Sequence, residues 1–74
     1  MKTYRLDTSG LRCPEPVLQI ASRATEMKEG DILEVIADCP TFEENVRIWC
    51  TRIKKELLSI QDIGNGKKKC QIKF

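Results

Sequence analysis

The six residues from 32 to 37, Ile-Leu-Glu-Val-Ile-Ala, constrain the fold of this chain more than any other segment. The run is short, mostly apolar and rich in β-branched side chains. Gly30 and Asp31 precede it, and Asp38, Cys39 and Pro40 follow it as a turn. A segment of this length and composition between turn signals predicts a central strand, the most buried strand of a sheet.

Apolar residues at helical spacing predict one helix before this strand in the sequence and one after it. The first helix is expected over residues 14–28 and the second over residues 42–57. Thr41 and Glu44, three positions apart, predict a capping box at the start of the second helix. The predicted buried residues are Val17, Ile20, Ala21, Ala24 and Met27 in the first helix, and Val46, Trp49, Cys50, Ile53 and Leu57 in the second.

Three further strands are expected, over residues 3–7, 58–63 and 69–74. Asn65-Gly66 between the last two predicts a tight hairpin turn. The first two strands should be parallel because a helix connects them. The prediction is an α/β (α+β) two-layer sandwich of order β-α-β-α-β-β, with a four-stranded mixed sheet, both helices on one face and a single domain over residues 1–74.

The composition excludes several classes of function. The chain has 74 residues, too few to enclose a deep pocket beneath a lid. It has no histidine, which excludes Ser-His and Cys-His nucleophile pairs and an imidazole base. A formal net charge of +2 does not indicate nucleic acid or membrane as a partner. The polar N-terminus and short apolar runs lead us to expect a cytoplasmic protein without a membrane span.

Four cysteines are present, and none forms a Cys-x-x-Cys pair, so neither a structural metal nor another cofactor is expected. Cys13 is predicted near the N-terminus of the first helix, where unpaired amides and Arg12 favour the thiolate and Glu15 opposes it. Pro14 and Pro16 would stiffen the backbone there. The alternative is an N-cap residue alone, although cysteine is not a preferred cap. A rigid, partly ionised thiol without a pocket or base favours a sulfur carrier over a stand-alone catalyst.

Cys39 follows the second strand as Cys13 follows the first, which places both at the same end of a parallel pair. Two interpretations stay open for Cys39: a second or resolving thiol, or a small residue filling the turn before Pro40. Cys50 and Cys70 fall on predicted inward faces, where cysteine behaves as a small apolar residue.

Asp7 and Asp38 end the first two strands, where each is expected to cap local amides or steer a partner. The C-terminal half is basic, and it is either an ordinary solvated surface or a docking patch for an acidic protein or tRNA. Aromatic side chains that stack on bases are scarce, so no stable nucleic-acid binding is expected. The lysines concerned are Lys54, Lys55, Lys67, Lys68, Lys69 and Lys73.

The segment Leu11-Arg12-Cys13-Pro14-Glu15-Pro16 resembles the Cys-Pro-x-Pro motif of the TusA (SirA-like) sulfurtransferase family. Leu6-Asp7, Gly10 and Ile36-Ala37-Asp38-Cys39-Pro40 also match that family's pattern, and the resemblance extends over essentially the whole chain. It implies that Cys13 accepts sulfur as a persulfide from a donor protein, either a cysteine desulfurase or a rhodanese-like protein. An acceptor protein then receives the sulfur for tRNA thiolation, molybdenum-cofactor synthesis or dissimilatory sulfur metabolism.

Two other functions remain alternatives at this point. One is a non-catalytic interaction or regulatory module with the same fold, and the other is a thiol redox protein that uses Cys13 and Cys39.

Overall fold

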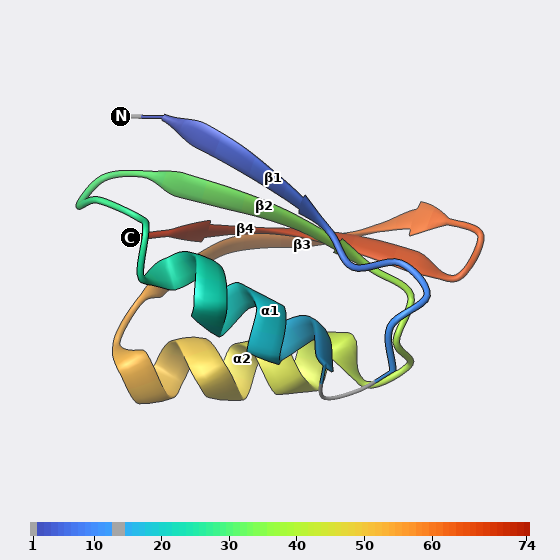
Figure 1. Ribbon diagram of the computed structural model, residues 1–74. Coiled ribbons are helices and arrows are strands. Elements are labelled where there is room, and N and C mark those ends of the chain that lie inside the picture. Colours follow the sequence, from blue (N-terminus) through green and yellow to red (C-terminus); the bar gives the residue numbers. More distant parts are fainter. Residues whose placement is uncertain (1, 13–14) are drawn as a thin grey trace.

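A computed structural model describes residues 2–12 and 15–74 of the chain. The elements are β1 (Thr3–Asp7), α1 (Glu15–Ala24), β2 (Ile32–Ala37), α2 (Phe42–Ile53), β3 (Glu56–Gly64) and β4 (Lys67–Lys73). The strands form one sheet in the order β1-β2-β4-β3, and both helices lie on one face of it (Figure 1). The predicted order and two-layer architecture are confirmed.

β2 is a central strand, as predicted from its composition. It pairs in parallel with β1 and antiparallel with β4. Leu33 and Val35 are fully buried and pair with Ile72 and Cys70 of β4, which are also fully buried. These paired residues form the floor of the core beneath the helices.

The helices complete the core from the other side. Ile20 of α1 and Phe42, Val46 and Cys50 of α2 are buried against the sheet. Burying a large aliphatic or aromatic side chain contributes about 1.5–3 kcal/mol, so these contacts hold the two layers together. Trp49 and Met27 are only partly buried at the margin of this core.

α1 is shorter than predicted, because it ends at Ala24 instead of continuing to residue 28. The amide of Met27 donates to the carbonyl of Ala24, three residues back, so the chain makes a turn there. The amide of Lys28 then donates to the Asp31 carboxylate at 3.0 Å. The Asp31 side chain thus takes a backbone donor that a longer helix would have used internally.

α2 also ends early, at Ile53 instead of residue 57. Lys54 has a left-handed backbone (φ 58°), and its amide donates to the carbonyl of Thr51 at 3.3 Å. This cap closes the helix, and Leu57 lies in β3, where it pairs with Ile72. Ile53, which was predicted to face inward, is 37% exposed at the helix end.

The predicted capping box at the start of α2 is wrong. Thr41 makes no side-chain cap hydrogen bond, because its backbone (φ −104°, ψ 17°) departs from the extended conformation typical of an N-cap. Its hydroxyl instead accepts a hydrogen bond from the side-chain amide of Asn45 at 3.2 Å. Glu44 is exposed.

The hairpin between β3 and β4 forms where Asn-Gly predicted it. Asn65 and Gly66 both have positive φ (56° and 73°), which is the backbone of a type I′ turn. Both strands are longer than predicted. A register shift between Leu57 and Ser59 explains the imperfect alternation of β3, because the extra residue breaks the two-residue period.

Candidate functional site

The loop that follows β1 is bonded to the end of the central strand. Thr8 is 1% exposed, and both its amide and its hydroxyl donate to the carbonyl of Ile36, each at 2.7 Å. The amide of Leu11 donates back to the carbonyl of Thr8 at 3.1 Å. The segment leading to Cys13 therefore begins at a residue, Thr8, that is hydrogen-bonded to β2.

Asp38 makes a second connection between the ends of β1 and β2. The amide of Gly10 donates to both carboxylate oxygens of Asp38, at 3.0 Å each. Gly10 has φ +88°, a backbone that other L residues rarely adopt, so the turn itself requires glycine. Asp38 was expected either to cap a local amide or to steer a partner; it does cap an amide, but one that lies 28 positions away in the chain.

Asp7 plays a smaller part in the same loop. Its carboxylate accepts the amide of Ser9 at 2.9 Å, two residues along the chain. This is the local turn that aspartate commonly stabilises at the end of a strand. It stiffens the loop before the Gly10 turn.

Arg12 and Glu15, the described residues on either side of the predicted nucleophile, are joined by a backbone hydrogen bond. The amide of Glu15 donates to the carbonyl of Arg12 at 2.7 Å, and both side chains are exposed. Pro16 is fully buried in the first turn of α1, which anchors the helix start in the core. Cys13 and Pro14 lie outside the described residues, so the thiolate at a helix N-terminus stays a prediction.

Cys39 comes directly after Asp38, at the same end of the sheet as the loop before α1. It is 6% exposed, and its Sγ lies 3.6 Å from the hydroxyl of Thr41. Its relation to Cys13 involves a position outside the described range. The role of a second thiol, like that of a turn-filling residue, therefore stays a prediction.

Cys50 and Cys70 are poor candidates for sulfur chemistry. They are 3% and 0% exposed, and both are free. Burial raises the pKa of Cys50 to about 11. Burial, with a smaller contribution from the neighbouring Cys50, raises the pKa of Cys70 to about 12. At neutral pH a thiol of pKa 11 is ionised in only about one molecule in ten thousand, and the thiolate is the nucleophile.

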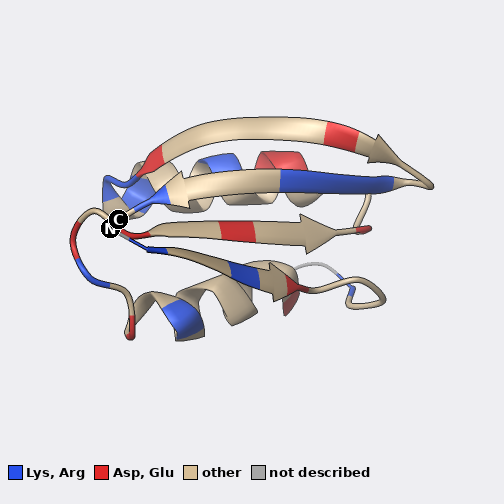
Figure 2. Ribbon diagram, turned by 90° about the horizontal axis from the view of Figure 1, so that it is seen from above, with Lys and Arg blue, Asp and Glu red and all other residues tan. Residues whose placement is uncertain are grey.

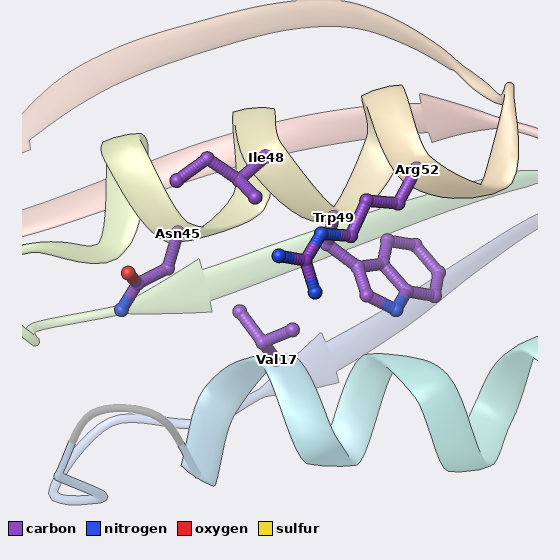
Figure 3. Close-up of a pocket in the computed structure, with 5 residues that line it drawn as sticks. All are labelled: Val17, Asn45, Ile48, Trp49 and Arg52. Carbon is purple, nitrogen blue, oxygen red and sulfur yellow. The ribbon is translucent and has the colours of Figure 1, made fainter.

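A groove between the two helices was not anticipated from the sequence. Val17 of α1 and Asn45, Ile48, Trp49 and Arg52 of α2 line it, and its volume is about 170 Å³. Trp49 and Arg52 extend from α2 toward α1, where Val17 points to meet them (Figure 3). One sequence signal was available: Ile48 is an apolar residue outside the predicted buried stripe of its helix.

The basic residues do not form one uniform patch. Residues 67–69 give the longest basic stretch, on β4 beside the end of β2 (Figure 2). Within it, Lys68 bonds to Glu43 at 3.0 Å, and Glu43 also bonds to Arg47 at 3.2 Å. These two hydrogen bonds, that from Lys68 first, hold the pKa of the Glu43 carboxyl below its ordinary value. Part of the basic surface is therefore neutralised within the protein.

Two further findings concern residues 2–12 and 15–74. No helix there is long and apolar enough to cross a membrane. No group of three or more Cys, Asp or Glu side chains in the same ranges is arranged to hold a metal ion.

Comparison with known families gives a match that agrees with this architecture. The family model described as Sulfurtransferase TusA matches residues 4–73, which is nearly the whole chain. The matched region includes the loop after β1, Cys13 and the Asp38 connection. Members of this family are sulfur carriers that interact with sulfur donor and acceptor proteins. The chain therefore belongs to the TusA sulfurtransferase family.

Proposed function

We propose that the chain accepts sulfane sulfur on Cys13 as a persulfide and passes it to an acceptor protein. The observation that carries this proposal is the loop before α1, bonded to β2 through Thr8 and through the contact of Gly10 with Asp38. These bonds fix the backbone from Thr8 to Leu11, and a fixed support for the reacting residue favours repeated transfer between two partners. The high pKa values of Cys50 and Cys70 further favour a cysteine in the loops as the nucleophile.

The loading step is a displacement at sulfur. The Cys13 thiolate attacks the outer sulfur of a donor persulfide, and an S–S bond forms between them. The S–S bond within the donor breaks, and its electron pair leaves with the donor's cysteine as a thiolate. The persulfide on Cys13 keeps the terminal proton, so the step needs no external oxidant or reductant. Unloading is the same reaction with an acceptor thiolate as the attacking group.

The sequence has no histidine, the residue that most often serves as a general base. In this proposal a partner supplies any base that the transfer requires. We therefore assign it the role of a persulfide carrier in the cytoplasm. The acceptor decides whether its sulfur reaches thiolated tRNA, the molybdenum cofactor or a dissimilatory pathway.

Intact-mass spectrometry with peptide mapping tests this function. The protein is incubated with inorganic polysulfide, and separately with a cysteine desulfurase and cysteine. We expect a reducible gain of one sulfur atom on Cys13 that is absent from Cys13→Ser, and serine should preserve the fold because it caps helices well. No gain on an alkylatable Cys13 from either source would contradict the proposal and favour an interaction module.

Cys39→Ser is the matched variant for the thiol redox alternative. A carrier with one essential thiol should keep its loading and discharge in this variant. Loss of both in Cys39→Ser, together with a reducible bond between Cys13 and Cys39 in the native chain, would instead indicate a redox pair.

A further inference from the structure

Exposed aliphatic side chains are prominent on the outer surface of the helix layer. Leu18 of α1 is 60% exposed and Ile48 of α2 is 48% exposed. The middle of the uncovered sheet face is polar by comparison. There Glu34 bonds to Arg5 and to Gln71, each at 3.3 Å, across three neighbouring strands. The middle of the sheet face thus satisfies the polar groups of Glu34, whereas the helix layer leaves Leu18 and Ile48 in water; on the sheet, exposed large apolar residues lie on β3, at Leu58 and Ile63.

The groove between α1 and α2 gives part of this apolar surface a concave shape that can receive a side chain. Val17 and the partly buried Trp49 line it, with Ile48 at the exposed edge (Figure 3). The Trp49 ring is held by an edge-on contact with Phe74, at 6.3 Å between ring centroids. A volume of about 170 Å³ is below the roughly 300–1,000 Å³ of small-molecule sites, so the groove suits one apolar side chain.

A cation lies at the edge of this groove. Arg52 lines it and forms no ion pair with any residue of the described ranges. Arg47, five positions earlier on α2, is by contrast bonded to Glu43. Arg52 and Ile48 also line a second hollow, together with Arg47 and Thr51. A guanidinium without an internal partner is suited to a carboxylate, which it binds through two parallel hydrogen bonds.

The groove is close in the chain to the proposed sulfur site. Val17 is in the first turn of α1 and follows Cys13 by four positions. A protein seated on the groove therefore contacts the helix that begins beside the nucleophile. A donor must hold its own persulfide against Cys13 during the transfer, so its contact surface has to lie next to that helix start.

We propose that this groove docks the sulfur donor protein, through a segment that carries an apolar side chain beside a carboxylate. The proposal rests on the function proposed above. The apolar side chain fills the space between Val17 and Trp49, and the carboxylate pairs with Arg52. RNA fits less well, because its contact surfaces are built from phosphates and stacked bases, whereas the edge here is aliphatic Ile48.

The test compares two ways of loading Cys13. Inorganic polysulfide is small and needs no docking surface, whereas a cysteine desulfurase charged with cysteine, or a rhodanese-type protein charged with thiosulfate, must dock. For each variant the initial rate with the protein donor is divided by the rate with polysulfide. We expect Ile48→Glu and Arg52→Glu to lower this ratio about tenfold or more, which corresponds to a loss of about 1.4 kcal/mol in the transition state for transfer.

Ile63→Glu is the matched control. Ile63 is 44% exposed on β3, close to the 48% of Ile48, so the change in charge and exposed area is the same at another site. This control should keep the wild-type ratio. An equal fall in Ile63→Glu, or an unchanged ratio in Ile48→Glu and Arg52→Glu, would overturn the docking site.

The remaining outcomes separate the docking proposal from the carrier function. If neither protein donor loads the wild type while polysulfide does, Cys13 is a sulfur acceptor but the groove is not a donor site. If loading is normal but Ile48→Glu slows discharge to an acceptor protein, the occupant is the acceptor and the donor assignment is wrong. If Ile48→Glu instead abolishes a dimer or binding to an RNA oligonucleotide, the groove belongs to that partner. Failure of polysulfide and of both protein donors to load wild-type Cys13 would contradict the carrier function itself.

Discussion

At each end of the sheet an aspartate side chain accepts backbone amides, but the two aspartates bond to different parts of the chain. At one end Asp31 accepts the amides of Lys28 and Lys2, and main-chain hydrogen bonds join the same region to Phe74. At the other end Asp38 accepts the amide of Gly10, in the loop that leads to Cys13. The first end joins three distant parts of the chain, and the second joins two loops.

This difference separates stability from function. Asp31 is 5% exposed and accepts two part-buried backbone amides, so its loss leaves two partly desolvated donors without their acceptor. The contact of Asp38 with Gly10 is exposed to solvent, so water replaces part of what is lost. We infer that the Asp31 end supports the fold as a whole, while the Asp38 end chiefly sets the position of the loop that leads to Cys13.

The largest effect on stability is expected from Asp31→Ala. Two backbone amides lose their acceptor, and we expect the Tm to fall by about 5–10 °C. Thermal unfolding followed by circular dichroism measures this. At a temperature where the variant is still folded, the rate of Cys13 loading by polysulfide should match the wild type. A selective loss of loading without a fall in Tm would contradict the division between the two ends.

Gly10→Ala is expected to have the next largest effect, now at the Asp38 end of the sheet. A side chain at φ +88° strains the backbone by about 1 kcal/mol, although no atom lies within 4 Å of the added Cβ. The loop should relieve this strain by moving, and we expect loading of Cys13 to slow by about tenfold. Initial rates with polysulfide and the Tm are measured together. Unchanged rates despite a lower Tm would show that the position of this turn does not matter to the chemistry.

The sequence predicts a strand or turn correctly where the residues of that segment alone determine its backbone conformation. The apolar run of β2 and the Asn-Gly turn are of this kind, and both were confirmed. The ends of α1 and α2 were misplaced, because the Asp31 carboxylate and the Lys54 backbone end these helices. A helical pattern in the sequence does not show where such hydrogen bonds interrupt it.

In the candidate site, too, some features were predicted from the sequence and others required the structure. The motif around Cys13 was visible from the sequence, and Asp38 was expected either to cap a local amide or to steer a partner. The identity of that amide required the structure, because Gly10 is 28 positions away. The groove was missed because Ile48 lies outside the predicted stripe of α2 and contributes to a site only together with Val17 from the other helix.

Asp38→Asn should have a smaller effect than either substitution above. The side-chain oxygen of asparagine still accepts the Gly10 amide, but the charge is lost. We expect loading of Cys13 to slow by about twofold to threefold, with a change in Tm of less than about 3 °C. Asp38→Ala, which removes the acceptor as well, is the comparison and should be slower still. Equal rates in the two variants would show that the carboxylate charge, and not the bond to Gly10, is what matters.

The smallest expected effect is a change of stability with pH at the Asp31 end. Hydrogen bonds from the amide of Lys28 and then that of Lys2 hold the pKa of Asp31 below its ordinary value of 3.8. Because the folded-state pKa is the lower one, the carboxylate stabilises the fold above pH 3.8, and this contribution is lost as the pH falls through the folded-state value. The Tm of the wild type should therefore approach that of Asp31→Asn as the pH is lowered from about 7 to about 2.

Asp7→Asn serves as the control for this last measurement, because Asp7 accepts one amide in an exposed turn at the other end of the sheet. The difference in Tm between wild type and Asp7→Asn should be small at every pH. A gap between wild type and Asp31→Asn that stays constant down to the lowest pH would mean that the charge of Asp31 contributes nothing. The greater importance of the Asp31 end would then come from the geometry of its hydrogen bonds, which asparagine keeps only in part.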